Sequence, residues 1–216
     1  MRAILLDLDD TLLDDRDATA KGFVAFFSAH KHKCTYVDED EALGAWRDAA
    51  RRHWARYERG ELSFQEQRRW RVRDVLGNPL NDTDADAAFL VYQQVYEASW
   101  QLLPDVSEFL ARTYALRPKV IITNGDRETQ LRKVAVTGLR AHVQGVITPA
   151  DCGHWKPSVE IFRAAIELLN VQPEQCLMIG DDPVRDVEPA AALGMKSFRV
   201  QSGVPGHGLL DAIASA

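Results

Sequence analysis

Five short apolar runs constrain the fold of this chain more than any other feature. They lie at residues 2–8, 119–123, 144–148, 176–180 and 196–200. Runs rich in Ile, Leu and Val that lack polar alternation are typical of strands buried on both faces of a parallel sheet. Helical patterns stand between the later runs, as in SVEIFRAAIELLN at residues 158–170, where apolar residues recur at helical spacing. This alternation predicts βαβ units and an α/β fold with a doubly wound, mostly parallel sheet.

One long stretch, residues 15–102, interrupts the alternation. It contains no strand-like run, and its periodicity predicts four helices near residues 16–32, 38–59, 63–77 and 82–102. Ser63 and Glu66 have the spacing of a capping box, and Gly77 stands where the third helix would end. Because such a stretch is too long for a connection within a sheet, it predicts an inserted helical bundle.

Composition and charge limit the class of protein. The chain has 216 residues, of which 46% are hydrophobic and 27% charged, as in ordinary globular proteins. A formal net charge of -6 argues against binding to nucleic acid or to an anionic membrane surface. No apolar run approaches the roughly 18 residues that a membrane span needs. The acidic start and three cysteines without paired spacing lead us to expect a reduced, cytoplasmic protein.

Polar side chains follow most of the predicted strands. Asp7 ends the first run, Thr123 and Asn124 end the second, and Asp181 follows the fourth. Lys156 comes one loop after the third run. Because ligands of open parallel sheets bind at the carboxyl ends of the strands, we expect these groups to converge.

The residue types in this set favour phosphoryl chemistry. Clustered carboxylates require a divalent cation, and hard oxygen ligands suit Mg²⁺. A lysine can hold a phosphate as a point charge, and a hydroxyl and backbone N–H groups add neutral donors. A carboxylate such as Asp7 can accept a phosphoryl group, and a second one two residues on, Asp9, can protonate the leaving alcohol and later activate water.

Four motifs occur in a fixed order. They are DLDDT at 7–11, TNG at 123–125, KP at 156–157 and GDDPVRD at 180–186. With these motifs the chain resembles the haloacid dehalogenase superfamily, specifically its phosphatases with a helical cap inserted after the first strand. The resemblance implies a Rossmann-like catalytic core at 1–14 and 103–216, a helical cap domain at 15–102, a Mg²⁺ cofactor and a small phosphorylated metabolite as substrate.

The resemblance also implies a role for each acid. Asp7 is similar to the family's nucleophile and metal ligand, and Asp9 to its general acid/base, whose backbone carbonyl also binds the metal. Asp181 is similar to the third protein ligand of Mg²⁺. Asp186 would either act on the metal indirectly, without contacting it, and help to orient it, or bind it directly. Asp182 departs from the small residue common at its position, and we expect it to cap a helix that begins with Pro183.

The remaining site residues follow in the same way. Thr123 and Asn124 are similar to the family's phosphate-binding pair, and Lys156 to the cation that steadies both the nucleophile and the phosphate. We expect Asp10 to support the loop rather than bind metal. Thr11 is either a capping hydroxyl or a support for catalysis. The tryptophans of the inserted stretch are expected in the core of its bundle.

Several functions share this core. A sugar phosphomutase uses the same two aspartates, whereas a hydrolytic 2-haloacid dehalogenase needs neither Mg²⁺ nor a proton donor. A signalling receiver module also gathers acids, Thr and Lys around a phosphorylated Asp, but it lacks a helical insertion and an acid two positions later. The phosphatase is therefore the leading hypothesis, while the physiological substrate and the oligomeric state are not encoded in a readable motif.

Overall fold

A computed structural model describes most of the chain. The described residues are 1–77, 79–113, 117–201, 203–204 and 206–214. This description omits residues 78, 114–116, 202, 205 and 215–216. These positions fall within the ranges predicted above as core and helical bundle. Within the described residues, no helix combines the length and the apolar composition that crossing a membrane requires.

The chain forms two compact units. The core unit comprises Met1–Asp14 and Gln101–Ala216, and the helical unit comprises Asp15–Trp100. The helical unit therefore ends before residue 102, the boundary expected from the sequence.

A parallel sheet forms the centre of the core unit. In the described residues it has five strands in the order β3-β2-β1-β4-β5, and every neighbouring pair is parallel. The strands are β1 (Ala3–Leu6), β2 (Lys119–Ile122), β3 (Gly145–Ile147), β4 (Cys176–Gly180) and β5 (Lys196–Arg199). Each of the five predicted runs thus forms a strand.

Burial differs between the centre and the edges of this sheet. All residues of β1, β2 and β4 are buried. Strand β3 is half-buried, and β5 is exposed at both of its ends. The expectation that all five runs are buried on both faces is wrong for β3 and β5, because these two strands form the edges of the sheet. Among the described residues, each of them has a strand neighbour on one side alone.

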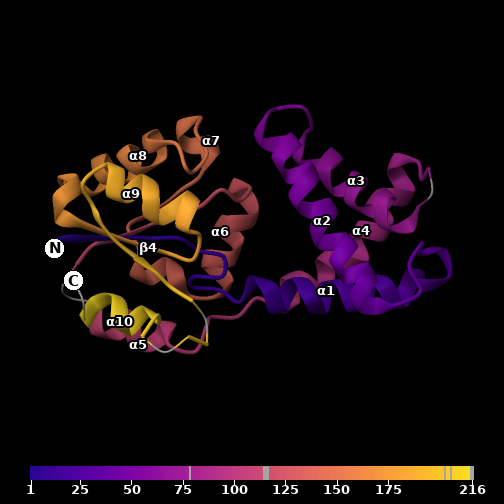
Figure 1. Cartoon of the computed structure of the whole chain (residues 1–216), viewed down its shortest axis with the longest axis horizontal. Helices are drawn as coiled ribbons and strands as arrows, with labels where there is room; N and C mark the ends of the chain where they lie inside the picture. The colour runs from indigo at the N-terminus through magenta and orange to yellow at the C-terminus, as the bar shows by residue number, and fades with distance from the viewer. Residues whose placement is uncertain (78, 114–116, 202, 205, 215–216) are drawn as a thin grey trace. The chain divides into compact units, whose positions relative to one another are not determined.

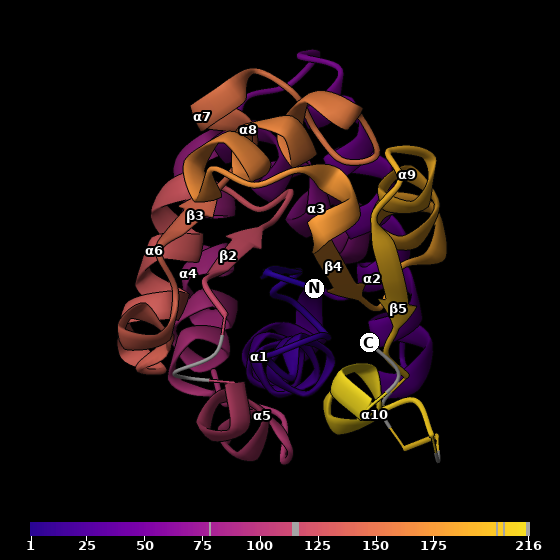
Figure 2. The same ribbon diagram turned by 90° about the vertical axis from the view of Figure 1, so that its left-hand side faces the viewer.

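Helices cover both faces of the sheet. Ile4 and Leu6 belong to one apolar cluster and Ala3 and Leu5 to another, because alternate side chains of a strand point to opposite faces. The first cluster includes residues of α5 (Val106–Thr113), α6 (Arg127–Val136) and α10 (Leu209–Ala214). The second includes residues of α8 (Val159–Leu169) and α9 (Glu188–Ala192). Figure 1 shows α8 and α9 above the sheet and α5 and α10 below it, and Figure 2, turned by 90°, again has α8 at the top and α5 and α10 at the bottom. The predicted doubly wound fold is confirmed.

Short helical segments complete the core unit. They are η2 (Leu139–His142), α7 (Pro149–Cys152), η3 (Pro173–Gln175) and η4 (Pro183–Val187).

The helical unit contains four longer helices and one short turn among its described residues. They are α1 (Asp15–His30), η1 (Lys31–Lys33), α2 (Glu39–Glu58), α3 (Phe64–Leu76) and α4 (Asp82–Ala98). The predicted capping box is present, since the backbone N–H of Glu66 donates to Ser63 Oγ and that of Ser63 to a Glu66 carboxylate oxygen. Gly77 ends α3 with a left-handed φ of 62°, a conformation that glycine adopts without strain.

Helix α4 ends at Ala98, before the predicted residue 102. The residues after it pair with the loop that follows β1: Asp14 N donates to Gln101 O at 3.1 Å, and Leu103 N donates to Leu12 O at 2.9 Å. These long-range backbone bonds compete with helical ones, and periodicity alone does not reveal them.

Aromatic side chains fill the core of the helical unit. Trp46 is fully buried, and its ring lies 4.8 to 6.0 Å, centroid to centroid, from those of Phe23, Phe26, Phe89 and Tyr92. Trp70, in contrast, leaves 38% of its surface exposed. The expectation that the tryptophans form the bundle core is confirmed for Trp46 and wrong for Trp70.

Candidate active site

The carboxyl ends of neighbouring strands bring the predicted residues together. Asp7 follows β1, Thr123 follows β2 and Asp181 follows β4, and these three strands are adjacent in the sheet. The ladder continues one residue past the strands, because Asp7 N donates to Ile179 O at 2.9 Å and Thr123 N to Ile147 O at 3.0 Å. The backbone of both residues is therefore fixed by the sheet.

Three acids form a compact cluster. Asp7, Asp181 and Asp186 each offer a carboxylate oxygen, and these oxygens lie within 4.8 Å of one another. Asp7 and Asp186 are buried and Asp181 is half-buried. Such closely spaced carboxylates repel one another unless a cation lies between them.

Lys156 is the cation between two of these acids. Its Nζ donates to Asp7 Oδ1 at 2.6 Å and to Asp186 Oδ1 at 2.7 Å, and the lysine is 4% exposed. Burial raises the pKa of Asp7 to about 6, with Lys156 opposing this change and Asp186 adding to it. Burial alone would lower the pKa of Lys156, but the two carboxylates outweigh it and raise that pKa. The lysine therefore stays charged while it serves two acids.

Thr11 is a direct partner of Asp7. Its Oγ1 donates to Asp7 Oδ2 at 3.1 Å, and the residue is fully buried. Both oxygens of Asp7 thus accept a hydrogen bond, one from Lys156 and one from Thr11. Of the two roles left open by the sequence, this contact agrees with support of the site.

Asp10 lies in the turn that follows Asp9. Its φ is 59°, a left-handed value that Asp tolerates better than most residues, and its N–H donates to Leu13 O at 2.8 Å. The acid cluster does not include it. This position agrees with the expected support of the loop.

Asn124 holds the main chain of Lys156. Its Nδ2 donates to Lys156 O at 2.8 Å, and Lys156 N donates to Asn124 Oδ1 at 2.6 Å. Both ends of the amide are therefore used to fix the lysine backbone, a role that the TNG motif does not reveal.

The carboxylate of Asp9 lies against α6. Lys133 Nζ donates to Asp9 Oδ1 at 2.6 Å, and Gln130 Nε2 donates to Asp9 Oδ2 at 2.8 Å. Gln130 Nε2 also donates to Thr123 Oγ1 at 2.7 Å. Neither Gln130 nor Lys133 was predicted as a site residue. Their three-residue spacing puts them on one helix face, but nothing in the sequence indicates that this face meets Asp9.

Asp182 and Gly180 shape the end of β4. Asp182 Oδ1 accepts from Val184 N at 2.8 Å and from Arg185 N at 3.1 Å, and Pro183 is the first residue of η4, so the predicted helix cap is confirmed. A Cβ on Gly180 would lie 2.6 Å from the Cβ of Asp186, closer than packed atoms approach. A residue without a side chain is therefore needed for Asp186 to reach the cluster.

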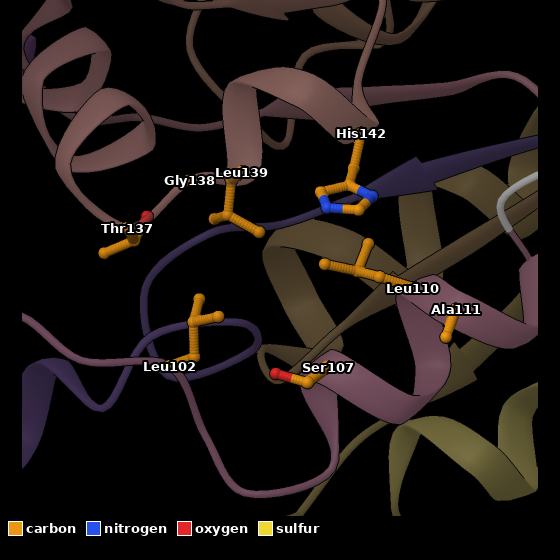
Figure 3. A pocket seen from close by; sticks show the side chains of 8 residues that line it. All are labelled: Leu102, Ser107, Leu110, Ala111, Thr137, Gly138, Leu139 and His142. Atoms are coloured by element: carbon orange, nitrogen blue, oxygen red, sulfur yellow. The ribbon is translucent and has the colours of Figure 1, made fainter.

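A separate pocket of about 280 Å³ lies elsewhere in the core unit. Figure 3 shows its walls, which include Leu102 from a loop, Leu110 from α5 and Leu139 from η2. None of the clustered acids lines it, and neither does Lys156 or Thr123. The pocket is therefore not part of the candidate active site.

Known proteins resemble the chain over almost its whole length. It is 30% identical to the phosphoserine phosphatase of Thermus thermophilus over 233 residues, which is 94% of this chain and 90% of that protein. It is 24% identical to the human N-acylneuraminate-9-phosphatase over 91% of this chain and 81% of that protein. The solved structure of the HAD-hydrolase YfnB from Bacillus subtilis bound to magnesium matches with a TM-score of 0.78 over 99% of this chain and 97% of that one, at 21% identity.

A sequence model of a known protein family matches most of this chain. That model describes a haloacid dehalogenase-like hydrolase and matches residues 1–194. The matched range contains strands β1 to β4 and all four motifs. The chain belongs to the family of haloacid dehalogenase-like hydrolases.

Proposed function

We propose that the protein is a Mg²⁺-dependent phosphatase that hydrolyses a small-molecule phosphomonoester through an aspartyl-phosphate on Asp7. The observation that carries the proposal is the contact between Asp7 and Lys156, 2.6 Å long and buried among further acids at the carboxyl edge of the sheet. The two relatives named above are both phosphatases of small phosphorylated compounds by name, which supports the same reaction class here.

The acid cluster fits a magnesium ion. Carboxylate oxygens are hard ligands, and the cluster of Asp7, Asp181 and Asp186 contains no sulfur or imidazole that would favour a softer metal. One lysine serves two buried acids, so the cluster keeps excess negative charge that a divalent ion would neutralise. Asp7, Asp181 and the backbone carbonyl of Asp9 would hold the ion.

Asp186 is suited to orient this set. Its Oδ1 accepts from Lys156 and its Oδ2 accepts from the backbone N–H of Asp182 at 3.2 Å. Both oxygens are thus already engaged within the protein, which favours an orienting role over direct binding. When bound, Mg²⁺ would offset the repulsion between the substrate phosphate and the carboxylates.

Asp7 and Asp9 divide the chemistry. An oxygen of Asp7 attacks phosphorus, a new P–O bond forms, and the bond to the leaving oxygen breaks while Asp9 gives that oxygen a proton. Water then attacks the phosphorus of the aspartyl-phosphate, and Asp9 takes its proton. Free phosphate leaves, and the Asp7 carboxylate is restored. Thr11 and Lys156 keep Asp7 in place through both steps.

The phosphate would be held by one hydroxyl, one backbone group and one cation. Thr123 supplies the hydroxyl and Lys156 the charge. Because the Asn124 side chain is used by Lys156, its contribution to phosphate binding would come from its backbone N–H. We further propose that the helical unit is the cap domain, whose residues select the substrate.

The proposal is tested by measuring phosphate release. The purified protein with Mg²⁺ should release inorganic phosphate from members of a panel of sugar, nucleotide and hydroxy-acid phosphates, and EDTA should abolish this release. Asp7→Asn should be folded and inactive. Asp10→Asn is the matched control, because it makes the same change three residues away in a left-handed position that Asn accepts.

The alternative functions give different products. A phosphomutase would convert one sugar phosphate into its isomer without net phosphate release, and a dehalogenase would release halide from a 2-haloacid without Mg²⁺. Full phosphatase activity in Asp7→Asn would contradict the mechanism, and inactivity of the wild-type protein on the whole panel would contradict the reaction class.

A further inference from the structure

The two α6 residues that contact Asp9 have no role in the mechanism so far. We propose that Gln130 and Lys133 form a positioning pair, which fixes the Asp9 carboxylate at both oxygens and directs the Thr123 hydroxyl proton toward the substrate phosphate. The proposal rests on the proposed function, since it assigns both residues by what Asp9 and Thr123 do there.

Lys133 is buried, and its ammonium group contacts the Asp9 carboxylate. It is 2% exposed, and lysine is almost never buried to this extent without a charged partner. Transfer of an ammonium group out of water is unfavourable unless a carboxylate compensates it. Asp9 Oδ1, at 2.6 Å from Nζ, provides that compensation. The position of Lys133 is thus linked to the predicted general acid/base.

The contacts restrict the Asp9 side chain at two points. Oδ1 accepts from Lys133 and Oδ2 accepts from Gln130, which is itself 1% exposed. A carboxylate held at both oxygens loses the freedom to rotate about its side-chain bonds. The step in which Asp9 takes a proton from water benefits from such prior placement, because the carboxylate need not be ordered during that step.

Gln130 connects Asp9 to Thr123. A carboxylate can only accept, so the NH₂ end of the amide faces Asp9, and its two N–H groups serve Asp9 Oδ2 and Thr123 Oγ1. Thr123 Oγ1 also accepts from the backbone N–H of Gly125 at 3.2 Å. With both of its lone pairs used, the hydroxyl can only donate its proton, which suits it to donate to the substrate phosphate in the proposed function.

The glycine of the TNG motif makes room for this arrangement. A Cβ on Gly125 would lie 2.5 Å from Cγ of Gln130 and closer still to its amide. Gly125→Ala would therefore push the Gln130 side chain away while leaving Gln130 itself in the chain. This substitution offers a way to disturb the pair without removing either member.

A double-mutant cycle with Asp9 separates positioning from a purely structural role. With p-nitrophenyl phosphate as substrate, Lys133→Met should lower kcat by about ten- to a hundred-fold and leave KM nearly unchanged. This loss is only a part of what acid–base catalysis contributes, because Asp9 itself remains. In the Asp9→Asn background the same change should alter kcat by less than about two-fold, because its effect passes through Asp9. Lys133→Arg should recover part of the loss.

Gln130 should show a different pattern from Lys133. Gln130→Met removes donors from both Asp9 and Thr123, so it should lower kcat and also raise KM. Gly125→Ala should act in the same direction. Arg112→Met is the control, because it removes an exposed helical cation paired with Glu108 in the same unit and should leave kcat and KM unchanged.

The outcomes distinguish this inference from the proposed function. An equal loss from Lys133→Met in the wild-type and Asp9→Asn backgrounds, or full kcat in Lys133→Met, would overturn the positioning pair and leave the phosphatase intact. Phosphatase activity that survives Asp7→Asn would overturn the function itself. If Lys133→Met does not fold, Gln130→Met in the same cycle with Asp9→Asn decides the question.

Discussion

Nζ of Lys156 lies 2.6 Å from Oδ1 of Asp7, although 149 positions separate the two residues in the chain. The same Nζ lies 2.7 Å from Asp186 Oδ1. One buried cation therefore serves two buried carboxylates, and the half-buried Asp181 adds a third acid nearby. This excess of negative charge at the end of β1 leads to testable consequences for stability, metal binding and activity.

Asp7 should destabilise the metal-free protein at neutral pH. Burial raises its pKa from 3.8 to about 6, so the folded state binds a proton more readily than the unfolded state between these values. Stability is therefore lost as the pH rises from about 4 to about 6. In EDTA at pH 7.5, Asp7→Asn should be more stable by a few kcal/mol, and this advantage should disappear near pH 4.

Urea unfolding of both proteins between pH 4 and pH 8 measures this difference. Asp10→Asn changes an acid outside the cluster. Its stability relative to the wild-type protein should therefore not change with pH in the way expected for Asp7→Asn. A less stable Asp7→Asn protein at pH 7.5 would show that the lysine contact outweighs the desolvation of the carboxylate.

Mg²⁺ should stabilise the folded protein, and more so at pH 8 than at pH 5. An ion that binds only the folded state raises the unfolding temperature, and protons compete with it for the carboxylates. Thermal unfolding with and without excess Mg²⁺ tests this directly. Asp181→Asn should abolish most of the shift, whereas Asp182→Asn should retain it, because the Asp182 carboxylate caps η4 instead. Equal shifts in both variants would remove Asp181 from the metal site.

Gly180→Ala should disrupt the site through Asp186. The added Cβ would lie 2.6 Å from the Asp186 Cβ, so the backbone of β4 or η4 must shift and Asp186 must leave Lys156. We expect a loss of phosphate release of about ten-fold or more together with a lower unfolding temperature. Gly44→Ala is the matched control, since its Cβ would meet nothing within 4 Å and Ala favours a helix by roughly 0.5–1 kcal/mol. An unaffected Gly180→Ala enzyme would mean that the site tolerates displacement of Asp186.

The sequence predicts the features that depend on local pattern. Each apolar run forms a strand, Asp182 caps η4, and Ser63 and Glu66 cap α3, because strand composition and cap geometry are decided within a few residues. Sheet order also brings Asp7 and Lys156 together as expected from parallel strands.

Features that depend on packing were not predicted. The contacts of Gln130 and Lys133 with Asp9 follow from the rotation of α6 about its axis, which its neighbours decide. The early end of α4 follows from backbone bonds of residues 101 and 103 to a loop distant in sequence. The exposed ends of β5 follow from its place at the sheet edge. None of these leaves a local signal.

Trp46 should be the dominant aromatic anchor of the helical unit. It is fully buried among Phe23, Phe26, Phe89 and Tyr92, so Trp46→Ala should cost about 3–5 kcal/mol of unfolding free energy through lost contacts and a cavity. Trp70→Ala should cost much less, because Trp70 is 38% exposed. Denaturation followed by far-UV circular dichroism measures both variants, and equal losses would contradict the central role of Trp46. Trp46→Phe should recover part of the stability, because a smaller ring keeps some of the aromatic contacts.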